Sequence, residues 1–264
     1  MKYQLLWQED FLPTPDGRPH PKLWNFDHGD GTAEEIPGWG NKEREFYVEQ
    51  NAKVDSGLTI TAHKSDPKSA PDAYYGKAEW LSSRIHTVGK VEFKYGRFDF
   101  EASTPTGGGS WPAIWMLGAN ISEVKWSDCG EIDIFEGAGN RPKEIRGTLH
   151  GPGYEADKGI TGALINDVDL AQDVHTFSIE WLPDVITWYA DSREYLTIKR
   201  SDVESVGKAW PFNANFYLVI NLAMGGWFAG DIVAGFEQCE FVVHSIRHFA
   251  IDGIGEVSFS GVSV

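Results

Sequence analysis

The chain has 264 residues, with 23 Lys or Arg against 39 Asp or Glu, and its formal net charge is -16. Nucleic-acid binding depends on clustered basic residues, so this charge excludes a nucleic-acid partner and favours a neutral or cationic one. No apolar stretch approaches the ~20 residues that cross a bilayer, and we therefore expect no membrane partner.

Apolar and polar residues alternate with period two wherever a period is recognisable, which is the pattern of β-strands. In chain order, the predicted strands cover residues 57–64, 91–102, 175–192 and 238–251. A hairpin is expected at Leu182-Pro183-Asp184, because Pro presets the turn dihedral and Asp bonds its own backbone. The one helix signal is 201–208, where Ser201 and Glu204 have the spacing of a capping box.

Many short strands separated by Gly- and Pro-containing turns, without alternating helices, predict an all-β fold, a β-sandwich jelly roll of two antiparallel sheets. The sequence shows no linker, composition shift or internal repeat, so residues 1–264 are predicted to form a single domain.

Cys129 and Cys239 are too few for a disulfide framework. Two small buried hydrophobic residues are the favoured interpretation, with a single bridge left open. The first ten residues, MKYQLLWQED, lack the apolar core of a secretory signal, so the protein is either cytoplasmic or given in a trimmed mature form.

Three acids, Glu131, Asp133 and Glu136, are interleaved with apolar residues within 128–140. In a regular strand Glu136 would lie on the face opposite the other two, because side chains alternate strictly. A β-bulge at Ile134-Phe135 would return it to their face. A helix fits less well, since positions five apart point in different directions. We therefore predict one bulged strand that presents three acids on one face.

Paired carboxyls about 5–5.5 Å apart are the machinery of retaining glycoside hydrolysis, in which one acid is a nucleophile and the other an acid/base. Mutual repulsion would keep one carboxyl protonated near neutral pH. The alternatives are a solvated edge strand and a site for a hard cation, but EF-hand spacing is absent and no metal is expected. The chain also has eleven Trp, of which we expect about a third to be exposed in a groove where they can stack on sugar rings.

At these residues the sequence resembles glycoside hydrolase family 16, in its laminarinase-like branch. The resemblance extends in family order over most of the chain, through the segments IPGWGN (36–41), YGRF (95–98), GGSWPAIWMLG (108–118), CGEIDIFEG (129–137), GTLHGPGY (147–154), HTFSIEW (175–181) and NLAMGG (221–226). It implies a jelly roll with a concave substrate cleft, and a retaining endo-β-1,3-glucanase that acts on laminarin-type glucan, with mixed-linkage β-1,3-1,4-glucan left open as a second substrate.

Carried over by motif, the resemblance implies that Glu131 is the nucleophile, Glu136 the acid/base, and Asp133 a helper that bonds Glu131 and modulates proton transfer. It also implies a set of substrate contacts, with Trp126 as a sugar platform: Trp126, Trp111, Trp115, Asn41, Arg84 and His150. Core packing remains open for the Trp111 and Trp115 pair, a structural role for His150, and simple pairing with an acid for Arg84.

The resemblance further implies a secreted, monomeric enzyme that needs no cofactor. Members of the family often have a structural calcium site with an Asp in the last strand; this chain has His244 there, although Glu9 matches the other end, so calcium is doubtful. Two other functions stay open: a non-catalytic β-glucan-binding module, and a hydrolase of another β-linked polysaccharide such as an algal galactan. A sulfated galactan would need basic residues that a chain at -16 lacks.

Overall fold

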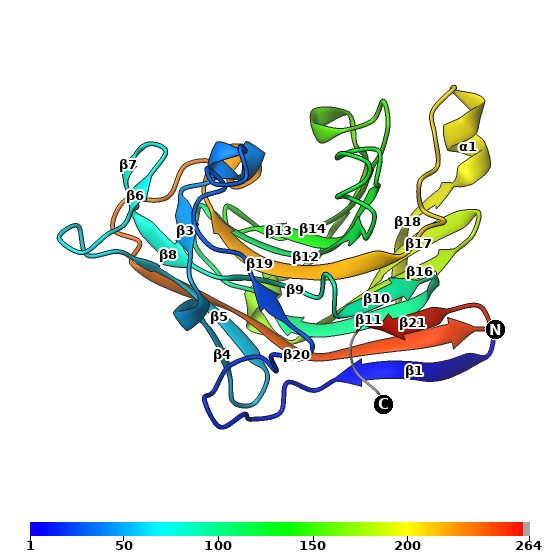
Figure 1. Ribbon diagram of the computed structural model, residues 1–264, viewed down its shortest axis with the longest axis horizontal. Coiled ribbons are helices and arrows are strands. Elements are labelled where there is room, and N and C mark those ends of the chain that lie inside the picture. Colours follow the sequence, from blue (N-terminus) through cyan, green and yellow to red (C-terminus); the bar gives the residue numbers. More distant parts are fainter. Residues whose placement is uncertain (261–264) are drawn as a thin grey trace.

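Two large sheets, antiparallel except for the short pair β3 and β8, lie face to face in the computed structural model, which describes residues 1–260 (Figure 1). The fold class is therefore the predicted all-β sandwich. A small separate hairpin is formed by β6 (Asp72–Ala73) and β7 (Gly76–Lys77).

The nine-stranded sheet has the order β15-β14-β13-β12-β19-β10-β21, with β9 paired to β19 and β2 paired to β9. Its strands are β2 (Asn25–Phe26), β9 (Arg84–His86), β10 (Val91–Lys94), β12 (Ser110–Gly118), β13 (Glu131–Ala138), β14 (Arg141–His150), β15 (Ile160–Ile165), β19 (Phe216–Met224) and β21 (Glu256–Phe259).

The ten-stranded sheet has the order β18-β17-β16-β11-β20-β5-β8-β3, with β1 paired to β20 and β4 paired to β5. Its strands are β1 (Tyr3–Glu9), β3 (Glu45–Tyr47), β4 (Ala52–Val54), β5 (Leu58–Lys64), β8 (Trp80–Ser82), β11 (Gly96–Ser103), β16 (His175–Leu182), β17 (Val185–Ala190), β18 (Arg193–Lys199) and β20 (Gln238–Ile251).

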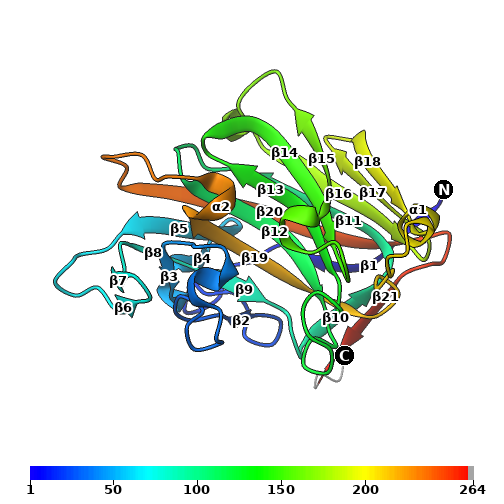
Figure 2. The same ribbon diagram turned by 90° about the horizontal axis from the view of Figure 1, so that it is seen from above.

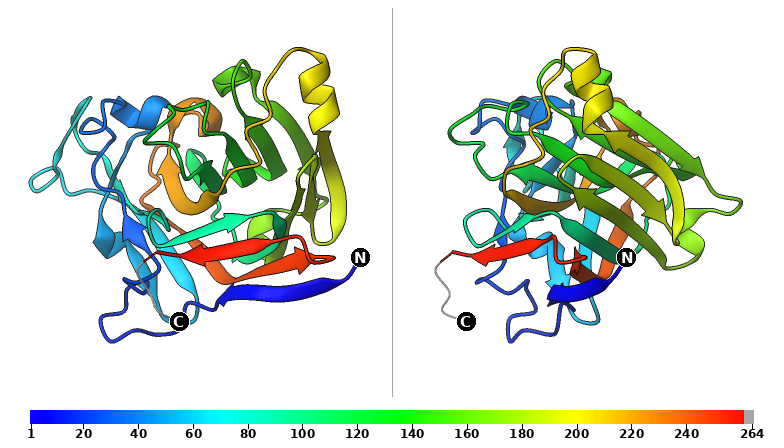
Figure 3. Two further views of the ribbon diagram at one scale, coloured as in Figure 1. Left: turned by 45° about the vertical axis from the view of Figure 1, so that its right-hand side comes forward. Right: turned by 90° about the vertical axis from the view of Figure 1, so that its right-hand side faces the viewer.

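The helices are short: α1 (Arg200–Ser205), α2 (Gly226–Ala229), and the 3-10 turns η1 (Pro37–Gly40), η2 (Glu49–Asn51), η3 (Ala156–Lys158) and η4 (Leu170–Gln172). Among residues 1–260, no helix has the length and apolarity required to cross a membrane. Seen from above, α2 lies beside the ends of β12 and β13 (Figure 2), and α1 projects beyond the end of β18 (Figure 3).

The strands predicted over 57–64 and 238–251 are confirmed as β5 and β20. The predicted hairpin is also confirmed, because Leu182 pairs with Val185 and leaves a two-residue loop between β16 and β17. The prediction of one strand over 91–102 was wrong. Tyr95 (φ 59°) and Gly96 (φ 102°) turn the chain there, so β10 and β11 belong to different sheets.

The predicted capping box at the start of α1 was also wrong. The helix begins one residue earlier, at Arg200, and its N-cap residue Lys199 makes no side-chain cap. Glu204 instead accepts a hydrogen bond from Arg200 at 2.8 Å, an i,i+4 ion pair that replaces the expected link to the backbone.

The core lies between the two sheets and is rich in aromatic rings. Phe135 of β13 stacks on Phe177 of β16 with ring centroids 3.8 Å apart, so the strand that carries the three acids is anchored directly to the opposite sheet. Cys129 and Cys239 are both free and buried, which confirms the interpretation as small hydrophobic residues.

Candidate active site

The predicted bulge in β13 is present. Against β12, Phe135 pairs with Ile114 and Asp133 pairs with Trp115, so Ile134 is the extra residue. The same shift occurs against β14. It places Glu131, Asp133 and Glu136 on the outer face of the nine-stranded sheet, while Ile134 and Phe135 are both buried in the core.

Each acid has its own ring-nitrogen partner. The Trp126 indole donates to Glu131 Oε2 at 2.6 Å, and the Trp111 indole donates to Glu136 Oε1 at 3.1 Å. His150 Nε2 lies 3.2 Å from Asp133 Oδ2. Glu131 and Glu136 are half-buried, whereas Asp133 between them is only 4% exposed. The carboxyls of Glu131 and Glu136 are therefore accessible to a ligand, whereas that of Asp133 is covered.

Burial raises the pKa of Glu136 to about 7; the His150 charge opposes this rise and the Glu131 charge adds to it. Burial first, and the two glutamate charges second, raise the pKa of Asp133 well above its ordinary value. A carboxyl with a pKa near 7 is half-protonated at neutral pH and can both donate and accept a proton. Such a group suits an acid/base.

His150 ends β14 and belongs to the site. Burial alone would lower its pKa, but the hydrogen bond to Asp133 and the charges of the three acids raise the pKa to about 9. Its ring centroid is 6.1 Å from that of Trp126. Glu131, Asp133 and His150 bring ligand-type atoms within 4.8 Å of one another, yet the hydrogen bonds above already engage each of them. The absence of a metal requirement stays a prediction.

Trp111 and Trp115 lie on the same face of β12 as the acids, as their four-residue spacing predicts, because Trp115 is the pairing partner of Asp133. Both are half-buried rather than part of the core. The Trp115 indole donates to Asn221 Oδ1 of β19 at 2.8 Å. They and the exposed Trp126 are three of the four Trp that are not buried, but only Trp126 and Trp227 are exposed, which is fewer than the expected third of eleven.

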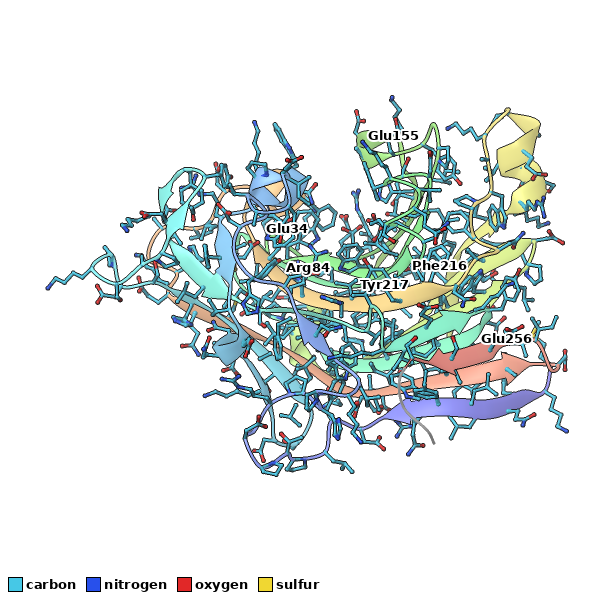
Figure 4. The ribbon with its side chains drawn as sticks, viewed as in Figure 1. Glu34, Arg84, Glu155, Phe216, Tyr217 and Glu256 are labelled. Carbon is cyan, nitrogen blue, oxygen red and sulfur yellow. The ribbon has the colours of Figure 1, made fainter. Side chains whose placement is uncertain are left out.

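Arg84 of β9 forms an ion pair with Asp27, in which Nε lies 2.8 Å from Oδ2. The open alternative for Arg84, pairing with an acid, is therefore confirmed. Its guanidinium also lies over the rings of Trp39 and Trp115, at 4.6 and 4.8 Å from their centroids. Figure 4 shows Arg84 between the segments that carry Glu34 and Glu155, which rise on either side of this face. The arginine thus packs against the indole of Trp115, one of the aromatic side chains that lie beside the three acids.

Asn41 follows η1 and is held by a buried polar network. Its side-chain amide donates to Glu43 Oε1 at 2.9 Å, and the Tyr47 hydroxyl lies 3.3 Å from Glu43 Oε2. Asn221 in turn donates to Tyr47 at 3.2 Å. Burial raises the pKa of Glu43, and burial with the Glu43 charge raises that of Glu45 further. The network links Asn41 to the partner of Trp115.

The two residues considered for calcium have other partners. Glu9 accepts hydrogen bonds from the Phe11 backbone at 2.8 Å and the Trp24 indole at 3.2 Å. His244 Nε2 lies 3.0 Å from the Ser103 hydroxyl. Both Glu9 oxygens are thus engaged by N–H donors, and the expectation about calcium stays a prediction.

Residues 39–240 match the family model of glycosyl hydrolases family 16. The chain belongs to this family. It is 35% identical to a beta-glucanase of Rhodothermus marinus over 87% of the chain and 78% of that protein.

Among solved structures, this family 16 chain resembles the catalytic domain of a Thermotoga maritima laminarinase, with a TM-score of 0.89, 39% identity, and coverage of 95% of this chain and 99% of that one. A Pyrococcus furiosus endo-β-1,3-glucanase gives a TM-score of 0.87 and 40% identity, with 94% of each chain covered. These comparisons support the jelly-roll fold and the family that the sequence predicts.

Several residues of this family 16 site were not predicted. Asn221 lies within the NLAMGG motif, so the motif held the signal and only its role was missed. Asp27 lies in FDHGD, which has no pattern that would single it out. Glu43, Glu45 and Tyr47 alternate as on one face of a strand, but that alternation does not tell a buried face from a solvated one.

Proposed function

We propose that this chain is a retaining endo-hydrolase of β-1,3-linked glucan, with Glu131 as nucleophile and Glu136 as general acid and base. The observation that carries the proposal is the bulged β13, which puts both glutamates on one face and gives Glu136 a pKa of about 7. Glycoside hydrolase activity follows from the family itself.

In the first step Glu136 donates its proton to the glycosidic oxygen while the Glu131 carboxylate attacks the anomeric carbon. The bond to the leaving sugar breaks and a glycosyl ester with Glu131 forms. In the second step the ionised Glu136 removes a proton from a water molecule, whose oxygen attacks the same carbon. The ester bond breaks, Glu131 regains its charge, and the product keeps the β-configuration.

Asp133 and His150 set the charge around the two glutamates. The raised pKa of Asp133 limits the negative charge between them, and the His150 cation offsets what remains. Neither group touches the scissile bond in this mechanism. Burial keeps Glu136 protonated for the first step, and the His150 charge limits this rise in its pKa, so that Glu136 can still ionise before the second.

The substrate is a neutral β-glucan, and the half-buried indoles of Trp111 and Trp115 with the exposed Trp126 offer the flat faces on which sugar rings stack. The relatives named beta-glucanase and laminarinase favour β-1,3-glucan, with mixed-linkage glucan as a second substrate. A binding-only module would have no use for the three acids. The enzyme would act outside the cell, as a monomer and without a cofactor.

The test is release of reducing sugar from laminarin and from mixed-linkage barley glucan, followed by proton NMR of the fresh products. We expect release from laminarin with a first-formed β-anomer. A folded protein that binds laminarin without cleaving it would be a binding module, and a first-formed α-anomer would mean inversion. Activity should survive dialysis against EDTA; a loss that added calcium restores would refute independence from metal.

A further inference from the structure

The bulge in β13 lies opposite a glycine. Against β14, Asp133 pairs with Thr148 and Glu136 pairs with Arg146, so the two bulged residues face Gly147 alone. Thr148 and Arg146 share the outer face with the acids, and Gly147 between them therefore faces the core. The strand that neighbours the catalytic bulge has no side chain at the point where the bulge is inserted.

Trp188 of β17, in the other sheet, occupies that space. A Cβ atom on Gly147 would come within 2.4 Å of Trp188 Cδ1, 2.6 Å of its Nε1 and 2.9 Å of the Tyr195 hydroxyl, so any side chain there would force these groups to shift. The indole is fully buried, and its Nε1 donates to the backbone carbonyl of Asp133 at 2.8 Å. A hydrogen bond thus crosses the core from one sheet to the carbonyl at which the bulge begins.

This contact matters because a bulge locally disrupts the ladder of backbone hydrogen bonds. A buried carbonyl needs a donor, and here the opposite sheet supplies one. The same carbonyl belongs to Asp133, which stands between Glu131 and Glu136 in sequence. Holding it fixes where the extra residue is inserted, and so fixes the offset between the two glutamates.

We propose that Trp188 is a positioning residue of the hydrolytic site. Its indole holds the bulge through the Asp133 carbonyl, and Gly147 leaves the space that the indole occupies. The inference rests on the roles proposed for Glu131 and Glu136. A double displacement depends on a short, fixed separation of the two carboxyls, and small misplacements of reacting groups cost rate. Trp188 does not touch the substrate, so its loss should lower kcat more than it changes KM.

The chain contains a matched control. Trp181 of the adjacent strand β16 is equally buried, and its indole donates at 2.9 Å to another backbone carbonyl, that of Phe212, which is not part of the catalytic strand. Trp188→Phe and Trp181→Phe each remove one buried indole N–H and a similar volume. A purely structural role for both predicts similar losses of thermal stability and no selective effect on kcat.

We would measure Tm, kcat and KM on laminarin for the wild type and both variants, at a temperature where all three are folded. Trp188→Phe should lower kcat about 10-fold or more with KM within about threefold, whereas Trp181→Phe should keep the wild-type kcat. An equal kcat in the two variants would overturn the proposal. Absence of turnover in the wild type would instead refute the proposed function, so the two failures are distinguishable.

Gly147→Ala provides the second arm, which also serves if Trp188→Phe fails to fold. The added methyl must displace the indole, so kcat should fall as in Trp188→Phe although Trp188 is still present. Combining the two substitutions should cost less than the product of their separate effects, because both act on one contact. A Gly147→Ala protein with wild-type kcat, or independent effects in the double variant, would overturn the proposal.

Discussion

Trp111 should set the upper pH limit of activity, because its indole donates a hydrogen bond to Glu136 at 3.1 Å. That bond stabilises the ionised carboxyl and lowers its pKa, against the effect of burial. Replacing Trp111 by Phe keeps a flat ring but removes the donor. The pKa of Glu136 should therefore rise above its value of about 7.

The size of this rise can be bounded. A hydrogen bond to a charged group contributes about 1.5–3 kcal/mol, and one pKa unit corresponds to about 1.4 kcal/mol, which gives a ceiling of about 1–2 units. Trp111 is half-buried, so water will replace part of the lost bond. We expect a rise of about 0.5–1 unit. Because Glu136 must be protonated to act first, the basic limb of the profile should move to higher pH.

The assay is kcat/KM on laminarin from pH 5 to pH 10 for the wild type, Trp111→Phe and Trp115→Phe. The last is the control, because Trp115 lies on the same face but donates to Asn221 instead of an acid. Both variants should lose some affinity with the lost stacking area, and only Trp111→Phe should show the alkaline shift. A basic limb that stays in place or moves to lower pH would refute the reasoning, as would equal shifts in both variants.

Three further predictions follow from other residues. Glu131→Ala should lower kcat by about 10⁴-fold or more with little change in Tm, and azide should then yield the α-glycosyl azide; retained product or near wild-type turnover would contradict its role as nucleophile. Burial lowers the pKa of His248 in the folded state from 6.5 to about 4. As the pH falls below 6.5 the unfolded state therefore binds a proton that the folded state does not bind, and the free energy of unfolding decreases. Urea unfolding at pH 7 and pH 4.5 should show that His248→Gln loses about 2 kcal/mol less than the wild type over this interval, and equal losses would refute the assignment. Glu45 accepts a hydrogen bond from the Met224 backbone at 2.7 Å, and burial beside Glu43 raises the pKa of Glu45. The neutral variant Glu45→Gln should therefore keep the wild-type Tm and KM, whereas Glu45→Leu should lower the free energy of unfolding in urea by about 1–3 kcal/mol. Equal behaviour of the two variants would exclude a role for the polar contact.

The catalytic strand was predictable because its information is local. Alternation decides which face each side chain takes, and three acids among apolar residues leave one arrangement that keeps the acids together, with a bulge at Ile134-Phe135. The hairpin at Pro183-Asp184 was predictable for the same reason, since turn chemistry is encoded in adjacent residues.

Contacts between the sheets were not predictable in this way. Trp188 lies in an alternating strand and looks like any core residue, because nothing near it in sequence indicates the Asp133 carbonyl 55 positions away. The change from one sheet to the other at Tyr95 was also not predicted. The alternation continues past it although the strand does not, and only the positive φ values of Tyr95 and Gly96 mark the change of sheet.

The three acids share one strand, while the segments beside them come from distant parts of the chain, including η1, α2 and the loop that carries η3 (Figure 1). In the proposed enzyme, chemistry and chain recognition are therefore encoded separately. Insertions or deletions in the surrounding loops could alter how many sugar units are accommodated, or which bends in the polysaccharide are tolerated, without displacing β13. Such an arrangement would let related enzymes diversify among glucans by loop exchange while conserving one rigid strand.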